Sequence, residues 1–318
     1  MEAHPGWCVN LLRAAQVRAG ENVLVVVDEP LAAEGSELAA AAEESGARPV
    51  LHLWAGSRPF GEAPPEIVAA AREADLSLHL QAEPLGEEAS ARFELLDAVT
   101  RRGGRQIFMG FVDGPLLRRE LSLPTPDLSP VARSLLAQLD GAETVRVRGG
   151  AGTDLVLGVA GRPWLTDALP LEPGGYGNYP GGEVFVAPHA DGADGVLVAD
   201  LTVPYTVEGL VDAPVRLRFE HGRVTSIEGG RAAHLLRELV AAAGEGADVV
   251  AELGIGFFPG LEPRGHVMLD EKAAGTAHVA IGRNTGLYGG DNEASIHVDC
   301  IFSAPQIEVD GRPLALPS

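Results

Sequence analysis

Two kinds of apolar pattern alternate over the N-terminal part of the chain. Residues 22–27 form a continuous apolar run typical of a buried strand, whereas residues 31–45 place apolar side chains at helical spacing. The same alternation predicts further strands and helices at 49–54, 64–74, 75–80, 87–101 and 106–111. Strands separated by helices pair in parallel, so this part is predicted to be an α/β domain with a mostly parallel sheet covered on both faces.

The turn after the first predicted strand lacks the glycine fingerprint of a dinucleotide site. It consists of Asp28, Glu29 and Pro30, and the two acids would repel a pyrophosphate rather than bind it. We therefore interpret the first domain as scaffold.

From residue 143 the pattern changes to short alternating strands. Residues 145–148 and 153–157 alternate around a glycine cluster, which predicts a hairpin. Further strands are expected at 183–186, 195–201, 215–220 and 224–227, and helices at 131–139 and 231–243. We therefore expect an N-terminal α/β domain over 1–141, followed by a β-rich α+β metal-binding domain over 142–318.

The amino-acid composition says more about possible binding partners than about the fold. The formal charge is −21 and no long basic run occurs, so neither nucleic acid nor an anionic membrane is expected as a partner. Only two cysteines occur, Cys8 and Cys300, far from Cys-x-x-Cys spacing, so any metal must use nitrogen and oxygen ligands. No leader peptide or membrane span is recognised, and a cytoplasmic location is expected.

Two glutamates lie in unusually uncharged surroundings. Glu183 follows a Gly-Pro loop and begins a predicted strand, and Glu252 is the one acid within residues 249–256. A buried carboxylate needs a cation. The alternatives are a solvated loop glutamate for Glu183 and a basic partner from elsewhere in the fold for Glu252.

Histidines and further acids gather in the last third of the chain. His297 and Asp299 share one face of a predicted strand, because strand side chains repeat every two residues. His278 lies in another predicted strand, seven residues after Glu271, and taken alone it fits a satisfied core histidine. Two histidines and several carboxylates in one domain indicate a metal centre with nitrogen and oxygen ligands.

These segments resemble the thermophilic aminopeptidase family that includes aminopeptidases T and S. The resemblance covers roughly residues 149–311 and is weak before them. The matching motifs are Gly152-Thr153-Asp154-Leu155, Asn178-x-Pro180-x-x-Glu183-Val184-Phe185, Ala251-Glu252-Leu253, Asp270-Glu271, His278-Val279-Ala280-Ile281-Gly282, Gly289-Gly290 and Ser295-Ile296-His297-Val298-Asp299.

The resemblance implies two divalent metal ions, zinc, cobalt or manganese, held by carboxylates and imidazoles. The implied metal ligands are Glu183, Glu252, Glu271, His278, His297 and Asp299. Glu252 and Asp299 are the expected bridges between the two ions. Glu271 is placed farther from His278 than in the family, so it is expected to act as a ligand, a base or neither.

The resemblance also implies an activity. Two metal ions activate a water and polarise the scissile carbonyl, which predicts a metallo-aminopeptidase, a hydrolase acting on small peptides. Glu183 or Glu271 would carry the proton to the leaving amine, and Tyr288 would be a shifted transition-state donor. A homodimer is implied as well.

Two other functions compete with this one. Family members resembling 2,5-dihydroxypyridine dioxygenase bind a single Fe(II), for which His297, Asp299 and either His266 or His278 would be the ligands. The two glutamates, Glu183 and Glu252, are not needed there. A non-catalytic binding protein on the same fold is the third possibility.

Overall fold

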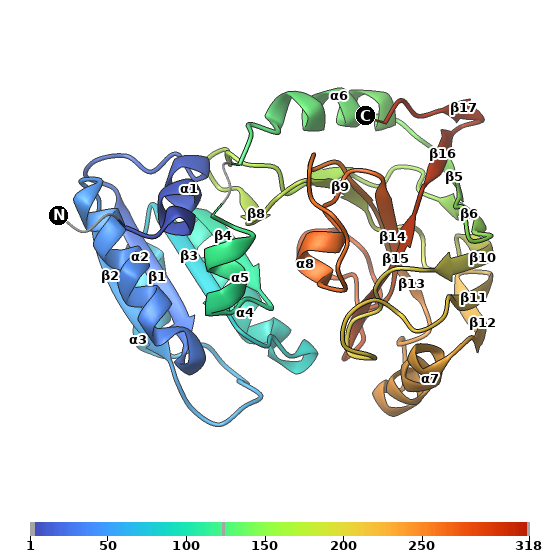
Figure 1. Ribbon diagram of the computed structural model, residues 1–318, viewed down its shortest axis with the longest axis horizontal. Helices are drawn as coiled ribbons and strands as arrows, with labels where there is room; N and C mark the ends of the chain where they lie inside the picture. The colour runs from blue at the N-terminus through green and yellow to red at the C-terminus, as the bar shows by residue number, and fades with distance from the viewer. Residues whose placement is uncertain (1–3, 123–124, 317–318) are drawn as a thin grey trace. The chain divides into compact units, whose positions relative to one another are not determined.

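The computed structural model describes residues 4–122 and 125–316 (Figure 1). Its internal contacts divide the chain into two compact units, 1–129 with 167–181, and 130–166 with 182–318. Each unit is built around sheets of its own.

The first unit contains, in its described part, one five-stranded sheet in the order β2-β1-β3-β4-β8, and every pairing in it is parallel. Its strands are β1 (Asn22–Asp28), β2 (Arg48–Trp54), β3 (Leu76–Gln81), β4 (Arg105–Gly110) and β8 (Tyr176–Asn178). Its helices are α1 (Gly6–Ala14), η1 (Glu29–Leu31), α2 (Ala32–Glu44), α3 (Pro65–Glu73), η2 (Gly86–Glu88), α4 (Ala89–Thr100) and α5 (Gly114–Arg119). The parallel α/β organisation expected from the sequence is confirmed.

Strand β1 shows how the sheet is covered. Leu24 belongs to a buried cluster with Ile67 of α3 and Leu95 of α4. Val27 contacts α2, where a Cβ added at Gly35 would lie only 2.9 Å from the Val27 methyl groups. Helices therefore pack on both faces, which explains the continuous apolar run in β1.

The second unit contains, among the residues described, two antiparallel sheets, ordered β12-β11-β10-β6-β5-β16-β17 and β15-β14-β13-β9-β7. Its strands are β5 (Thr144–Arg148), β6 (Asp154–Gly158), β7 (Leu165–Thr166), β9 (Glu183–Val186), β10 (Ala193–Ala199), β11 (Val215–Glu220), β12 (Arg223–Glu228), β13 (Val250–Gly256), β14 (Thr276–Gly282), β15 (His297–Ser303), β16 (Gln306–Val309) and β17 (Arg312–Pro313). Its helices are α6 (Ser129–Leu139), α7 (Arg231–Ala243), α8 (Val267–Asp270) and η3 (Gly286–Tyr288). The hairpin around the glycine cluster is confirmed as the antiparallel pair β5 and β6.

The two compact units do not follow the order of the chain throughout. Most of α6 belongs to the second unit, as its internal contacts show. Residues 167–181 belong to the first unit, because β8 pairs with β4 there. The pattern does not reveal β8, since its three residues are too short to show a period. The functional domains expected at 1–141 and 142–318 stay a prediction.

Strands β13 and β14 lie at the centre of the second unit. Every residue in both strands is buried, so each strand is covered on both faces (Figure 1). No described helix is long and apolar enough to cross a membrane.

A buried carboxylate ties together the loops after β2 and β3 in the first unit. Glu88 is fully buried and accepts hydrogen bonds from the backbone N–H groups of Phe60 and Leu85, both at 3.1 Å. Its oxygens also accept from Gln81 Nε2 at 2.6 Å and Arg58 Nε at 2.8 Å. Burial acts to raise the pKa of Glu88, but these donors, Arg58 foremost, outweigh it and lower the pKa.

Replacing Glu88 by alanine should lower the free energy of unfolding by about 3–5 kcal/mol, because the Arg58 guanidinium and the backbone donors lose their acceptor. The exposed neighbour Glu87 offers a matched control. Glu87→Ala should change the free energy by less than about 0.5 kcal/mol. Urea unfolding of both variants measures the difference, and equal losses would contradict the importance of the buried network.

Candidate metal centre

One face of the β15-β14-β13-β9 sheet collects the predicted ligands. Cross-strand partners share a face, and so do residues two apart on one strand. The register pairs Gly254 with His278 and Ala280 with Asp299, and the same face carries three further predicted residues. These are Glu183 on β9, Glu252 on β13 and His297 on β15.

Several positions opposite the predicted ligands carry almost no side chain. Gly256 lies opposite Glu183, Ala280 opposite Glu252, and Gly282 opposite His297. At Gly254, an added Cβ would lie only 2.1 Å from the His278 ring. Small residues therefore make room for the imidazoles and carboxylates on a face that is otherwise fully packed.

The two imidazoles approach the carboxylates by their Nε2 atoms. His278 Nε2 lies 3.5 Å from Glu252 Oε1, 3.7 Å from Asp299 Oδ1 and 3.8 Å from Glu183 Oε2. His297 Nε2 lies 3.2 Å from both Glu252 Oε2 and Asp299 Oδ1. The two oxygens of Glu252 thus face different histidines.

These atoms form two groups that could each hold a metal ion. The ligand atoms of Glu183, Glu252 and His278 lie within 4.8 Å of one another, and so do those of Glu252, His297 and Asp299. We name them the His278 group and the His297 group. They share Glu252, and nitrogen and oxygen donors of this kind suit zinc, cobalt, manganese or iron. The donor set therefore fits a divalent metal.

The charges of the site reinforce one another in the absence of a metal. Burial would lower the pKa of His278, but Glu252, Asp299 and Glu183 raise it to about 10. Burial would likewise lower the pKa of His297, but Asp299 and Glu252 raise it well above its usual value. Conversely, burial would raise the pKa of Glu252, but the two histidines lower it. The carboxylates therefore give the site a negative electrostatic potential that favours the binding of cations.

The His297 ring is held from both sides. Its Nδ1 atom lies 2.6 Å from the carbonyl oxygen of Arg283, and donation to that oxygen leaves Nε2 free to bind a metal. Tyr288 stacks on the same ring with the centroids 4.9 Å apart and the planes at 21°. In contrast, His278 Nδ1 is buried and has no hydrogen-bond partner among the described residues.

Lys272 adds a charge that sequence reasoning missed. Its side chain is 1% exposed, and Nζ lies 2.5 Å from Glu183 Oε1 and 2.8 Å from Glu271 Oε1. Burial raises the pKa of Glu271, and the charge of Lys272 opposes that shift. The sequence did contain a signal, because Lys272 is the single lysine among the 24 basic residues of the chain.

The structure brings five of the six predicted metal ligands into the two groups. Glu271 lies outside both and pairs with Lys272, and Tyr288 reaches the site by stacking on His297. His266, the alternative iron ligand, also lies outside both groups, and its backbone N–H donates to Asp270 at 3.2 Å. The metal ligands and catalytic roles assigned from the sequence stay predictions.

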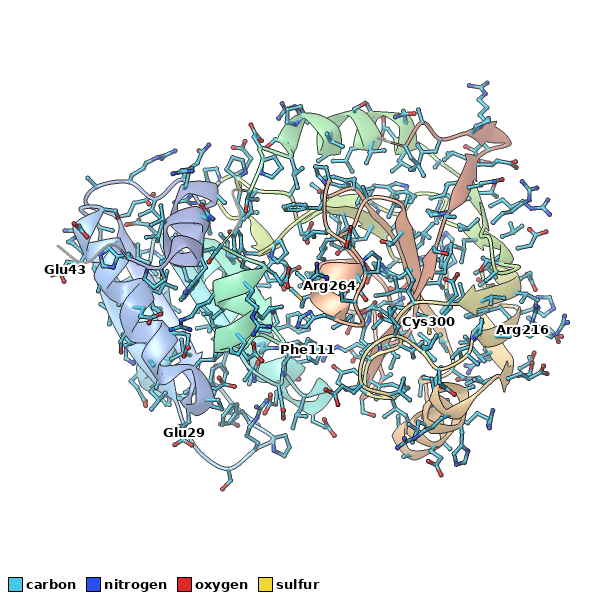
Figure 2. The ribbon with its side chains drawn as sticks, in the orientation of Figure 1. Glu29, Glu43, Phe111, Arg216, Arg264 and Cys300 are labelled. Carbon is cyan, nitrogen blue, oxygen red and sulfur yellow. The ribbon has the colours of Figure 1, made fainter. Side chains whose placement is uncertain are left out.

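Figure 2 places this sheet among the side chains of the second unit, with Cys300 marking β15 and Arg264 the segment before α8. That segment is tied to a buried acid, Asp270, which accepts from Arg264 N at 2.8 Å and Gly265 N at 2.7 Å. Thr202 Oγ1 donates to the same carboxylate at 2.5 Å. Asp270 thus fixes the short helix that ends beside Glu271 and Lys272.

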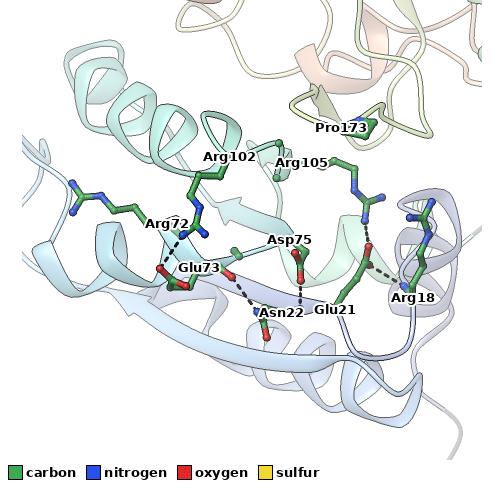
Figure 3. A pocket seen from close by; sticks show the side chains of 12 residues that line it. Arg18, Glu21, Asn22, Arg72, Glu73, Asp75, Arg102, Arg105 and Pro173 are labelled. Carbon is green, nitrogen blue, oxygen red and sulfur yellow. Dashed lines mark hydrogen bonds and ion pairs between the residues drawn. The ribbon is translucent and has the colours of Figure 1, made fainter.

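A polar pocket of about 380 Å³ lies in the first unit (Figure 3). Its arginines and acids are largely paired with one another, since Arg105 bonds Glu21 at 2.8 Å and Arg102 bonds Glu73 at 3.1 Å. It lies at the amino ends of β1 and β4, whereas parallel α/β sheets bind ligands beyond the carboxyl ends of their strands. We assign it no functional role.

The fold and the two ligand groups define a candidate metal-binding protein of mixed α/β architecture. The chain belongs to the family described as 2,5-dihydroxypyridine 5,6-dioxygenase, whose family model matches residues 5–316.

Curated relatives carry two different activities. Aminopeptidase T of Thermus thermophilus is 30% identical over 189 residues, 51% of this chain and 43% of that protein. The 2,5-dihydroxypyridine 5,6-dioxygenase of Pseudomonas putida is 27% identical over 208 residues, 61% of this chain and 59% of that protein. The chain therefore spans about half the length of the curated relatives that it matches.

Solved structures of the same two kinds share the fold. The dioxygenase of Pseudomonas putida has a TM-score of 0.78 at 22% identity, covering 98% of this chain and 94% of that one. Wild-type AmpT of Thermus thermophilus has a TM-score of 0.70 at 22% identity, covering 98% and 96%. The resemblance to aminopeptidases is thus confirmed in part, on a fold that both activities share.

Gly254 offers a test of the packing around His278. Gly254→Ala should lower the free energy of unfolding by about 1–3 kcal/mol and shift the His278 imidazole resonances, because the new methyl group overlaps the ring. Gly150→Ala is the control, since a Cβ there meets no atom closer than 3.9 Å. Denaturant unfolding and histidine NMR measure both effects. Unchanged His278 resonances in Gly254→Ala would contradict the packing.

Proposed function

We propose that the chain is a metal-dependent hydrolase that removes N-terminal residues from small peptides. The position of Glu252 is the observation that carries this proposal. Its two oxygens lie 3.5 and 3.2 Å from the Nε2 atoms of His278 and His297, as a carboxylate bridging two neighbouring metal positions requires. A mononuclear site needs neither this bridge nor a further glutamate at Glu183.

Metal ions bound by these groups would lower the pKa of a coordinated water, polarise the scissile carbonyl and bind the free amine of the peptide. We propose zinc, cobalt or manganese, because the donors are imidazole nitrogen and carboxylate oxygen. The protein's own contribution is a rigid, buried sheet face that fixes the ligand positions before substrate arrives.

Proton transfer to the leaving amine falls to Glu271 in this proposal. Its pKa is raised by burial, which brings a carboxyl group closer to the range where it both accepts and donates a proton near neutral pH. Glu183 is itself part of the His278 group and is already paired with Lys272. Tyr288, stacked on His297, is the proposed donor to the developing oxyanion.

A ring-cleaving dioxygenase is the second candidate, because the family model covers nearly the whole chain. The site offers the composition that mononuclear iron enzymes use. Asp299 Oδ1 lies 3.2 Å from His297 Nε2 and 3.7 Å from His278 Nε2, which provides two imidazoles and one carboxylate.

Metal analysis and two assays separate these candidates. The purified chain is assayed with zinc, cobalt or manganese on amino-acid anilides and dipeptides, and with Fe(II) under anaerobic loading on 2,5-dihydroxypyridine with oxygen uptake recorded. Peptide hydrolysis without oxygen uptake supports the hydrolase. Iron-dependent oxygen uptake without peptide hydrolysis would refute the hydrolase and support the dioxygenase.

Glu252→Gln should lower both metal content and peptide hydrolysis by more than about 100-fold, since loss of even an outer partner of a metal ligand costs about 10–100-fold. Glu220→Gln, an exposed position on β11, is the matched control and should leave both unchanged. Metal is measured by mass spectrometry and hydrolysis by initial rates. Normal hydrolysis in Glu252→Gln would refute the proposed function.

A further inference from the structure

The single lysine of the chain lies in the candidate metal centre. Of the 24 basic residues, 23 are arginine, and Lys272 is the exception. It is also among the largest fully buried side chains of the protein. A chain that uses arginine at every other basic position thus has its one compact ammonium charge next to the predicted ligands.

The contacts of Lys272 show how this charge is held. An ammonium is a compact point charge with three donors, whereas a guanidinium is planar and larger. Nζ contacts Glu183 Oε1 at 2.5 Å and Glu271 Oε1 at 2.8 Å, so it lies between two carboxylates as a small cation does. Because these two carboxylate oxygens already contact the ammonium, they are less available to bind a metal ion.

Glu183 links this charge to the His278 group. Its Oε1 atom accepts from Lys272, while its Oε2 atom lies 3.8 Å from His278 Nε2. A metal ion in the His278 group would therefore share one carboxylate with a buried ammonium. Like charges repel strongly where water is excluded, so Lys272 disfavours an ion at this position.

A second, independent difference separates the two groups. His297 Nδ1 has the Arg283 carbonyl oxygen at 2.6 Å, which fixes its tautomer and ring orientation for a metal at Nε2. His278 Nδ1 has no hydrogen-bond partner in the part of the chain that the structure describes. Such outer hydrogen bonds change metal affinity by about 10–100-fold.

We propose that Lys272 makes the two metal positions unequal. The His297 group binds one ion tightly, and the His278 group binds a second ion only weakly, because the Lys272 ammonium already supplies positive charge beside Glu183. This inference rests on the metal binding of the proposed function and adds to it the residue that sets how many ions are bound.

The test is a Co²⁺ titration of the metal-free chain, residues 1–318, measured by calorimetry and by metal analysis after dialysis. The unmodified chain should bind one ion tightly and a second at least about tenfold more weakly. Lys272→Met removes the charge at similar length and should tighten the second ion at least about tenfold. Lys272→Arg keeps the charge and should leave the second ion weak.

Removing each histidine shows which group is the tight one. His278→Ala should still retain one ion after dialysis, whereas His297→Ala should lose it. Two equally tight ions in the unmodified chain, or an unchanged second affinity in Lys272→Met, would overturn the inference. If Lys272→Met does not fold, Lys272→Gln takes its place, because its neutral amide can still donate a hydrogen bond to a carboxylate.

These measurements separate this inference from the proposed function, because none of them uses turnover. Unequal metal affinities without peptide hydrolysis would refute the proposed hydrolase activity but not the proposed role of Lys272. Peptide hydrolysis with two equally tight ions would refute the role of Lys272 but not the hydrolase activity. Labelling with ¹⁵N-lysine adds a direct probe, since the chain has one lysine side chain and its Nζ signal should shift when the second ion binds.

Discussion

The structure of the second unit depends on one constraint, which is the cost of burying several carboxylates close together. Glu183, Glu252 and Glu271 are less than 10% exposed, and Asp299 shares the sheet face of Glu183 and Glu252. Unpaired, such charges would cost several kcal/mol each. The protein offsets that cost with two imidazoles and the Lys272 ammonium, and a metal ion would complete the compensation. Charge balance therefore explains why these residue types occur together.

The sheet meets this constraint through register and residue size together. A shift of one residue in any strand would turn its ligand to the opposite face, so the pairing of β13, β14 and β15 is fixed by the positions of Glu252, His278 and Asp299. Glycines and an alanine lie opposite several of these ligands, most tightly at Gly254 beside the His278 ring. The strength of the site thus comes from a rigid scaffold rather than from mobile loops.

Local patterns allowed much of this arrangement to be predicted. Period-two spacing placed His297 and Asp299 on one face, and alternating strands and helices gave the parallel sheet of the first unit. The pairing of Glu271 with Lys272 was not predictable from spacing, because it depends on how α8 ends and on the Asp270 contacts that fix it. Strand β8 was missed for a similar reason, since it pairs with β4 far away in sequence. The rarity of lysine was visible in the sequence, but its partners were not.

Two reactions on one fold differ in the number of metal ions that they need. Ring cleavage uses one iron held by two histidines and a carboxylate, whereas two-metal hydrolysis needs a bridging carboxylate and further acids. The donor set of this chain contains both compositions, because Asp299 contacts both imidazoles and Glu252 lies between them. The ligands alone therefore do not determine the chemistry. In our proposal, the Lys272 ammonium beside Glu183 lowers the affinity for the second ion, so a charged neighbour of the ligands adds to their effect on ion number.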